Sequence, residues 1–162
     1  MEEDKKLTAA ISGDGAEFFV ASQIMLNLKL LVSIAPTSAP SWDLEVTHPT
    51  TGKSAKVQVK FRTRLEKTTP HLRLRGGVNF DFLVLVETPL EVKADTGGVS
   101  SKRWFDGIEN VAFNLYPTWI ISKEVADGLM YMSKNKNKGH MVRSFRKPEH
   151  LFNWKIIKEA LE

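Results

Sequence analysis

The sequence of 162 residues contains no cysteine and only four histidines. Without cysteine the chain can form no disulfide, no thiolate nucleophile and no cysteine-ligated zinc or iron–sulfur centre. The histidines, at positions 48, 71, 140 and 150, are scattered along the chain, which argues against a metal site built from several of them. Cysteine-based chemistry is therefore excluded, and a multi-histidine metal site is disfavoured.

Long apolar segments are also lacking. No run approaches the roughly 18 to 20 apolar residues of a membrane-spanning helix, and the polar residues 1–6 lack the apolar stretch of a signal peptide. We therefore expect a cytoplasmic protein without membrane association. The length and the absence of a Pro/Gly/Ser-rich linker predict one domain over residues 1–162. Its core is expected over about 13–122, followed by a basic segment and helix over about 132–162.

The basic residues are concentrated in two segments. Between Lys53 and Gly77 eight Lys/Arg stand against one acid, and between Lys134 and Lys147 six stand against none. The formal net charge of +4 thus combines local charges of +7 and +6 with −9 elsewhere. This distribution indicates an anionic partner such as nucleic acid, although solvated lysine-rich loops would give the same pattern. The residues predicted to contact nucleic acid are Arg62, Arg64, Lys67, Arg73, Arg75, Lys134, Lys136, Lys138 and Arg143.

Apolar periodicity predicts a helix over about residues 13–28. Its expected inward face comprises Phe18, Ala21, Ile24, Met25 and Leu28, with capping residues at 12–14. A strand over residues 30–35 is expected to follow. The alternating segments 42–47 and 54–62, joined by a turn over 48–52, predict a hairpin.

The second half of the chain predicts further strands and helices. The almost wholly apolar run 80–86 is typical of a strand buried on both faces. An excursion is expected over 91–107, a strand over 117–121, a short helix over 123–130 capped by Ser122, and a C-terminal helix over 149–161. The apolar face of that last helix is expected to comprise Leu151, Trp154, Ile157 and Leu161. This order predicts an α/β or α+β fold with a mixed sheet flanked by helices.

Four polar side chains are expected to converge beside the hairpin. Gln58 and Lys60 are two apart on one strand and share a face, and Asp43 lies on the partner strand. Glu17 is in phase with the apolar helix stripe, where an acid is costly unless it is paired or binds a metal. Such a set suits Mg²⁺-assisted phosphodiester hydrolysis, because carboxylate, amide and carbonyl oxygens bind a hard cation and a nearby lysine stabilises developing negative charge.

Here the chain resembles the PD-(D/E)XK nucleases, the superfamily of type II restriction enzymes and archaeal Holliday-junction resolvases. The resemblance rests on residues 15–23 (GAEFFVASQ), 42–44 (WDL) and 58–60 (QVK), with 80–86 as the next core strand. It implies the restriction endonuclease-like α/β fold, a metal held by Asp43, Gln58, the Val59 carbonyl and Glu17, and Lys60 as the catalytic lysine.

Two residues depart from the family pattern. Trp42 replaces the proline, and Gln58 replaces the second acid. The family includes active Q-x-K members among resolvase-like and homing-type nucleases, so the glutamine does not imply a loss of activity. A neutral amide binds Mg²⁺ less strongly than a carboxylate does, which implies a weaker metal site.

Other roles for these residues remain open. Glu17 could pair with a lysine on the helix surface, Asp43 and Lys60 could form a cross-strand ion pair, and Glu45 could replace Asp43 as the ligand. The leading hypothesis is an Mg²⁺- or Mn²⁺-dependent DNA endonuclease, structure-selective or junction-directed, acting as a homodimer with one site per strand. The alternatives are a DNA-binding module that has lost its chemistry and a protein-interaction domain.

Overall fold

A computed structural model of the chain describes residues 2–36, 39, 41–62, 71–73, 79–88, 116–132, 138–141 and 145–162. In this part of the chain a mixed five-stranded sheet has the order β1-β2-β3-β5-β6. Its strands are β1 (Leu31–Ile34), β2 (Leu44–Thr47), β3 (Ser54–Arg62), β5 (Phe82–Glu87) and β6 (Thr118–Ser122). The β3–β5 pair is parallel and the other neighbours are antiparallel. Predicted and observed strands agree to within a few residues.

The β2–β3 hairpin matches the predicted alternation. Leu44 and Val46 are buried and lie opposite Val57 and Ala55. The turn between the strands includes Gly52, whose φ of 70° is a conformation that glycine adopts at no steric cost. His48 belongs to the same turn, where its Nδ1 accepts hydrogen bonds from the backbone N–H groups of Thr50 and Thr51. The alternation and the turn together determine which β3 side chains point to each face of the sheet.

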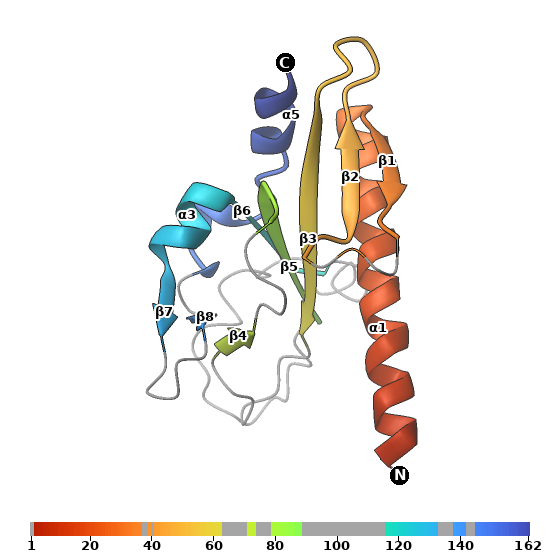
Figure 1. Ribbon diagram of the computed structural model, residues 1–162, viewed down its shortest axis with the longest axis vertical. Coiled ribbons are helices and arrows are strands. Elements are labelled where there is room, and N and C mark those ends of the chain that lie inside the picture. Colours follow the sequence, from red (N-terminus) through yellow and green to blue (C-terminus); the bar gives the residue numbers. More distant parts are fainter. Residues whose placement is uncertain are drawn as a thin grey trace, which may run out of the picture.

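Helices pack on the side of the sheet that carries Val57 and Val59. These are α1 (Glu2–Gln23), which continues as a π-helical turn (Ile24–Leu28), and the C-terminal α5 (Lys155–Leu161). Figure 1 shows α1 alongside the β1–β2–β3 part of the sheet, with its N-terminal turns extending beyond the strands. The core on this side contains Ala16, Val20, Ala21, Ile24, Leu30, Leu44, Val46, Ala55, Val57, Val59, Phe82, Val84, Val86, Ile120, Ile157 and Leu161.

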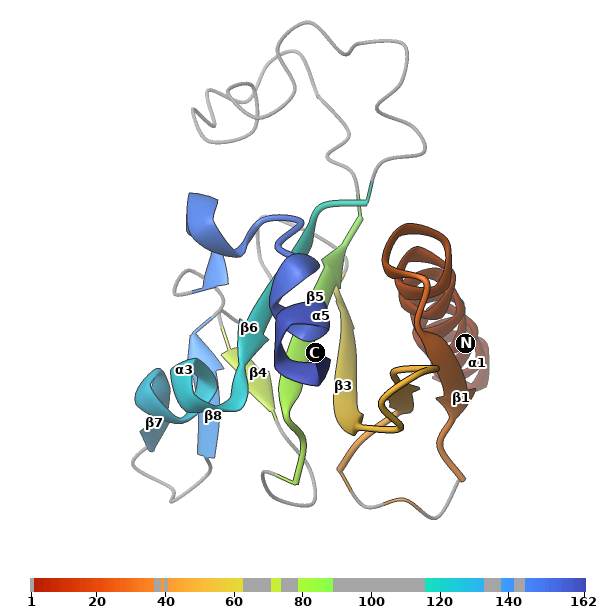
Figure 2. The same ribbon diagram turned by 90° about the horizontal axis from the view of Figure 1, so that it is seen from above.

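A second core lies on the opposite side of the sheet. It comprises Leu72, Phe80, Leu83, Leu85, Trp119, Ile121, Ala126 and Phe145. The helix α3 (Lys123–Gly128) contributes Ala126, and the Ser122 hydroxyl caps it by accepting a hydrogen bond from Val125 N, as expected. Figure 2 shows α3 near the β6 edge of the sheet, away from α1. Because β5 contributes to both cores, it is buried on both faces, as its composition predicts.

The first helix is longer and faces differently than expected. It begins at Glu2, so residues 12–14 lie inside it and do not cap it. Its buried side is formed by Ala16, Val20 and Ile24, whereas Phe18 is 64% exposed and Met25 is 48% exposed. The prediction that Phe18 and Met25 face inward was wrong. The helix carries apolar residues on two sides, and small alanines form part of the buried one.

The C-terminal helix is also interrupted. A 3-10 turn, η3 (Pro148–His150), precedes Phe152, whose φ of 51° ends regular helical geometry before α5 begins. Leu151 bridges to Trp119 and packs in the second core, while Ile157 and Leu161 pack in the first. The four residues predicted to share one face are therefore divided between the two sides of the sheet.

A second sheet joins the two basic segments. Its strands are β4 (His71–Arg73), β8 (Lys138–Met141) and β7 (Met130–Met132), in the order β4-β8-β7 among the described residues. Arg73 pairs with Gly139 and Leu72 with His140 across β4 and β8. The predicted excursion over 91–107 lies outside the described residues. None of the helices in the described ranges is both long enough and apolar enough to cross a bilayer.

Candidate active site

Asp43 is held in place by backbone hydrogen bonds to two neighbouring segments. It immediately precedes β2, and its N–H donates to the carbonyl of Val57 at 2.9 Å. Its own carbonyl accepts a hydrogen bond from Ala35 N at 2.7 Å. These bonds fix the backbone of Asp43 between β3 and the segment that follows β1. The hairpin register then places its side chain against the middle of β3.

The Asp43 carboxylate contacts two residues of β3 directly. Its Oδ2 atom accepts a hydrogen bond from Gln58 Nε2 and another, of 2.6 Å, from the backbone N–H of Val59. Gln58 is only 4% exposed, and its Nε2 also donates to the Val59 carbonyl at 3.3 Å. The amide NH₂ of Gln58 therefore lies between two oxygens that the resemblance assigns as metal ligands.

Lys60 lies two residues beyond Gln58 on β3 and so projects from the same face of the strand. It is half-buried. Together with the Asp43–Gln58 contact, this spacing places Asp43, Gln58 and Lys60 on one side of the hairpin.

Glu17, on α1, is electrostatically coupled to this group. The pKa of its carboxyl is raised to about 7: partial burial is the largest cause, the neighbouring Asp43 and Asp14 act in the same direction, and Lys60 acts to lower it. Asp43 and Lys60 can act on Glu17 in this way only if the three charges are close. Glu17 is thus within electrostatic reach of Asp43 and Lys60, although α1 packs on the Val57 and Val59 side of the sheet, opposite the face from which Gln58 and Lys60 project.

The donor atoms present fit a hard divalent cation of the Mg²⁺ type. Among the described residues no group of three or more His, Asp or Glu side chains is clustered tightly enough to hold a metal alone. A mixed set is available: the carboxylates of Asp43 and Glu17, the Gln58 amide and the Val59 carbonyl, all oxygen donors of the kind that Mg²⁺ binds. Rotation of the Gln58 side-chain amide by half a turn would place its oxygen, and not its NH₂ group, at the position that faces Asp43.

Glu45 occupies a different place. It lies opposite Lys56, two residues nearer the hairpin turn than Asp43. The direct contact with Gln58 and Val59 belongs to Asp43, which favours Asp43 over Glu45 as the ligand.

The residues predicted to contact nucleic acid are only partly described. Arg62 ends β3 on the face of Gln58 and Lys60 and is half-buried. Arg73 and Lys138 lie on the paired strands β4 and β8, so the two basic segments meet in the second sheet. The other members of the predicted set, Arg64, Lys67, Arg75, Lys134, Lys136 and Arg143, lie outside the described residues.

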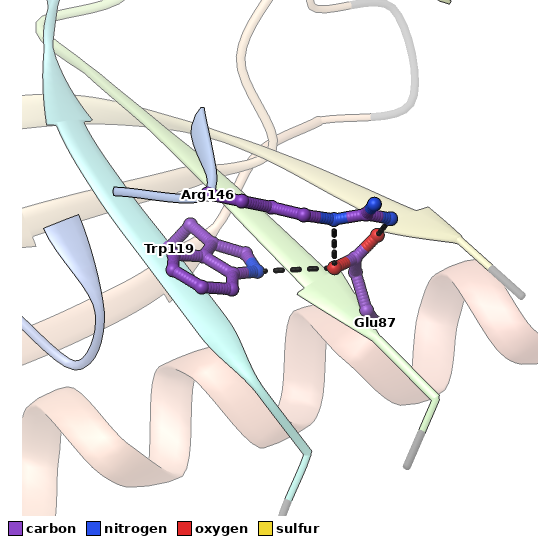
Figure 3. A network of polar contacts seen from close by, with 3 residues as sticks. All are labelled: Glu87, Trp119 and Arg146. Atoms are coloured by element: carbon purple, nitrogen blue, oxygen red, sulfur yellow. Dashed lines mark hydrogen bonds and ion pairs between the residues drawn. The ribbon is translucent and has the colours of Figure 1, made fainter. Parts of the chain in front are cut away.

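One polar cluster was missed by sequence analysis. Glu87, at the end of β5, is fully buried and contacts both Trp119 and Arg146 (Figure 3). Trp119 is a core residue at 2% exposure, and its indole N–H donates a hydrogen bond to Glu87. The available signal was an acid at the end of the apolar run of residues 82–86. The partner Arg146 is 59 residues away, and nothing local predicts the contact.

The comparisons with known proteins identify the fold. No protein-family model matches the chain, and no relative is found among curated sequences. The solved structure of a bacterial homing endonuclease, I-Ssp6803I, is similar with a TM-score of 0.55 and 20% sequence identity, covering 93% of each chain. With the mixed five-stranded sheet and its flanking helices, this similarity confirms the predicted restriction endonuclease-like fold.

Proposed function

We propose that this protein is a metal-dependent DNA endonuclease that hydrolyses phosphodiester bonds. The observation that carries the proposal is the Asp43 carboxylate, bonded to Gln58 and Val59 of β3, beside Lys60 and within electrostatic reach of Glu17. The fold is that of I-Ssp6803I, described as a homing endonuclease. A DNA substrate also agrees with the two basic segments of the chain.

Each residue of the site has a proposed part. Asp43, Glu17, the Gln58 amide oxygen and the Val59 carbonyl hold Mg²⁺ or Mn²⁺, which when bound makes a water more acidic and offsets charge on the phosphate. The Lys60 ammonium donates hydrogen bonds, which orient the attacking water or stabilise a phosphoryl oxygen as its negative charge grows. Burial of Gln58 on β3 keeps these groups in fixed positions during the reaction.

A homodimer is part of the proposal. Cutting both strands of a duplex is simplest with two sites related by a two-fold axis. Leu7, Ile11 and Phe18 recur at four and seven residues on the outer side of α1 and are 62%, 62% and 64% exposed. This apolar stripe lies opposite the buried side of α1 and is available to a second copy of the chain.

A DNA-binding module without catalytic activity is the second candidate. The contact that favours it is the hydrogen bond from Gln58 to Asp43, which satisfies the carboxylate without any cation. A cleavage assay with Mg²⁺ or Mn²⁺ on duplex, branched and single-stranded DNA separates the candidates. The endonuclease proposal predicts metal-dependent cleavage that Lys60→Ala abolishes and that Lys155→Ala, a change on the exposed side of α5, leaves intact. Salt-sensitive binding without cleavage would favour the binding module.

A further inference from the structure

Glu87 is the one buried acid among the described residues, and its carboxylate has polar contacts with two side chains (Figure 3). Its Oε2 accepts hydrogen bonds from Trp119 Nε1 and Arg146 Nε, both at 3.1 Å. Its Oε1 accepts from Arg146 Nη2 at 2.6 Å. The guanidinium therefore binds the carboxylate through two parallel contacts, an arrangement that fixes its orientation.

Stability alone is a poor explanation for this network. Glu87 is 0% exposed, and removing a carboxylate from water carries a large desolvation cost that an ion pair roughly repays. An apolar pair of similar volume would hold the same segments together at least as well. A charged pair at this position is therefore better explained by a role of the charges in binding than by a contribution to stability.

Arg62 belongs to the same cluster. It lies opposite Glu87 in the β3–β5 register, and its carbonyl accepts a hydrogen bond from Thr88 N. Burial lowers the pKa of the Arg62 guanidinium, Glu87 raises it and Arg146 lowers it, so all three charges interact. The Glu87 carboxylate is thus bonded to Arg146 and within electrostatic reach of Arg62, and the three side chains together carry a net positive charge.

The cluster continues the row of site residues on β3. Gln58, Lys60 and Arg62 project from one face of the strand, with about 6.6 Å between successive members. Among the described residues Arg146 donates from Nε and Nη2 to Glu87, and its side chain is 29% exposed, so a ligand can reach it. The planar, multi-donor guanidinium group is well suited to phosphate oxygens. A DNA strand that places one phosphate beside Lys60 would pass the two arginines next.

We infer that Glu87 is a positioning residue that holds Arg62 and Arg146 as a binding site for a DNA backbone phosphate next to the cleaved bond. The inference rests on the proposed function, since it assumes a DNA substrate. It assigns a binding role to Arg146 and explains why an acid is buried at position 87. The carboxylate acts through the arginines and does not contact DNA.

The test measures binding of a fluorescently labelled DNA duplex in EDTA, where no cleavage occurs, over a range of KCl concentrations. Arg62→Ala and Arg146→Ala each weaken binding about tenfold and lower the slope of log Kd against log salt by about 1, because one phosphate contact is lost. The matched control Lys155→Ala removes an exposed cation from α5, on the opposite side of the sheet, and leaves the slope unchanged.

Glu87→Gln distinguishes positioning from simple attraction. The variant makes the site more positive, so unspecific attraction would tighten DNA binding. Positioning predicts weaker binding instead, because the arginines repel each other once their shared carboxylate is gone. Binding as tight as that of the unmodified protein, or tighter, overturns the inference. If Glu87→Gln does not fold, Arg146→Lys replaces it as the test. This variant keeps the positive charge but loses the two-point contact with Glu87, so the inference predicts that it binds DNA more weakly, and unchanged binding overturns it.

The inference and the proposed function fail in different ways. An unmodified protein whose DNA binding is absent or insensitive to salt contradicts the proposed function itself. Salt-sensitive binding that Arg62→Ala and Arg146→Ala change no more than Lys155→Ala does would leave the endonuclease proposal standing and overturn the phosphate site.

Discussion

Gln58 Nε2 donates a hydrogen bond to Asp43 Oδ2 across the β2–β3 hairpin. A glutamate at position 58 could not make this bond, because it would set two carboxylates against each other at a buried position. The amide thus lets the site form without a cation to separate two negative charges. It also supplies an oxygen for a cation after a half-turn of the side chain.

Exchange of this amide for an acid tests the role of Gln58. Gln58→Glu is expected to lower the free energy of unfolding by about 2 kcal/mol in EDTA, since a buried hydrogen bond is replaced by carboxylate repulsion. Mg²⁺ should restore much of this loss and should stimulate cleavage at a lower concentration than in the unmodified protein. Urea unfolding and cleavage, each titrated with Mg²⁺, provide the measurements.

Gln58→Ala should instead raise the metal requirement or eliminate cleavage. If the three proteins give superimposable Mg²⁺ curves, Gln58 is not a ligand.

The raised pKa of Glu17 predicts a pH-dependent stability. Burial, Asp43 and Asp14 together lift this pKa from 4.5 to about 7, so the folded protein holds a proton that the unfolded chain releases near pH 4.5. Metal-free protein should therefore lose stability as the pH rises from about 4.5 to about 7. Glu17→Gln should lose less over the same range. Thermal unfolding in EDTA across this range measures the difference, and parallel curves for the two proteins would refute the coupling.

The exposed stripe on α1 predicts the oligomeric state. Ile11→Lys places a charge among apolar side chains that the proposed homodimer covers, and sedimentation should show a shift from dimer to monomer. Because Ile11 is 62% exposed, the fold itself should be little affected. Val125→Lys, at a 37% exposed apolar position on α3, is the matched control and should leave the dimer intact. An unmodified protein that sediments as a monomer with or without DNA would contradict the dimer proposal.

The sequence was most informative where structure is local. The β2–β3 hairpin follows from strict alternation and a turn at Gly52, and that hairpin alone brings Asp43 to Gln58. The orientation of α1 was harder to predict, because Ala16 and Val20 are buried while the larger Phe18 is exposed. When both sides of a helix carry apolar residues, side-chain size is a weak guide to which side is buried.

Contacts between distant segments could not be predicted in the same way. The pairing of β4 with β8 joins residues near 72 to residues near 140, and no local pattern encodes it. The same holds for Glu87 and Arg146, which meet because the chain after β8 packs on the side of the sheet that carries Leu83 and Leu85 of β5. The loss of helical geometry at Phe152 depends similarly on its N–H donating to the Thr118 carbonyl of β6.

The most direct test of the account is metal-dependent cleavage by Asp43→Asn, with DNA binding measured on the same preparation. The variant is expected to cleave at least about 100-fold more slowly, because the amide cannot replace the charged ligand. DNA binding should stay similar or become tighter, since a negative charge near the phosphate is removed. The matched control Glu45→Gln, two residues nearer the turn, should cleave normally. Full activity in Asp43→Asn would contradict the proposed active site.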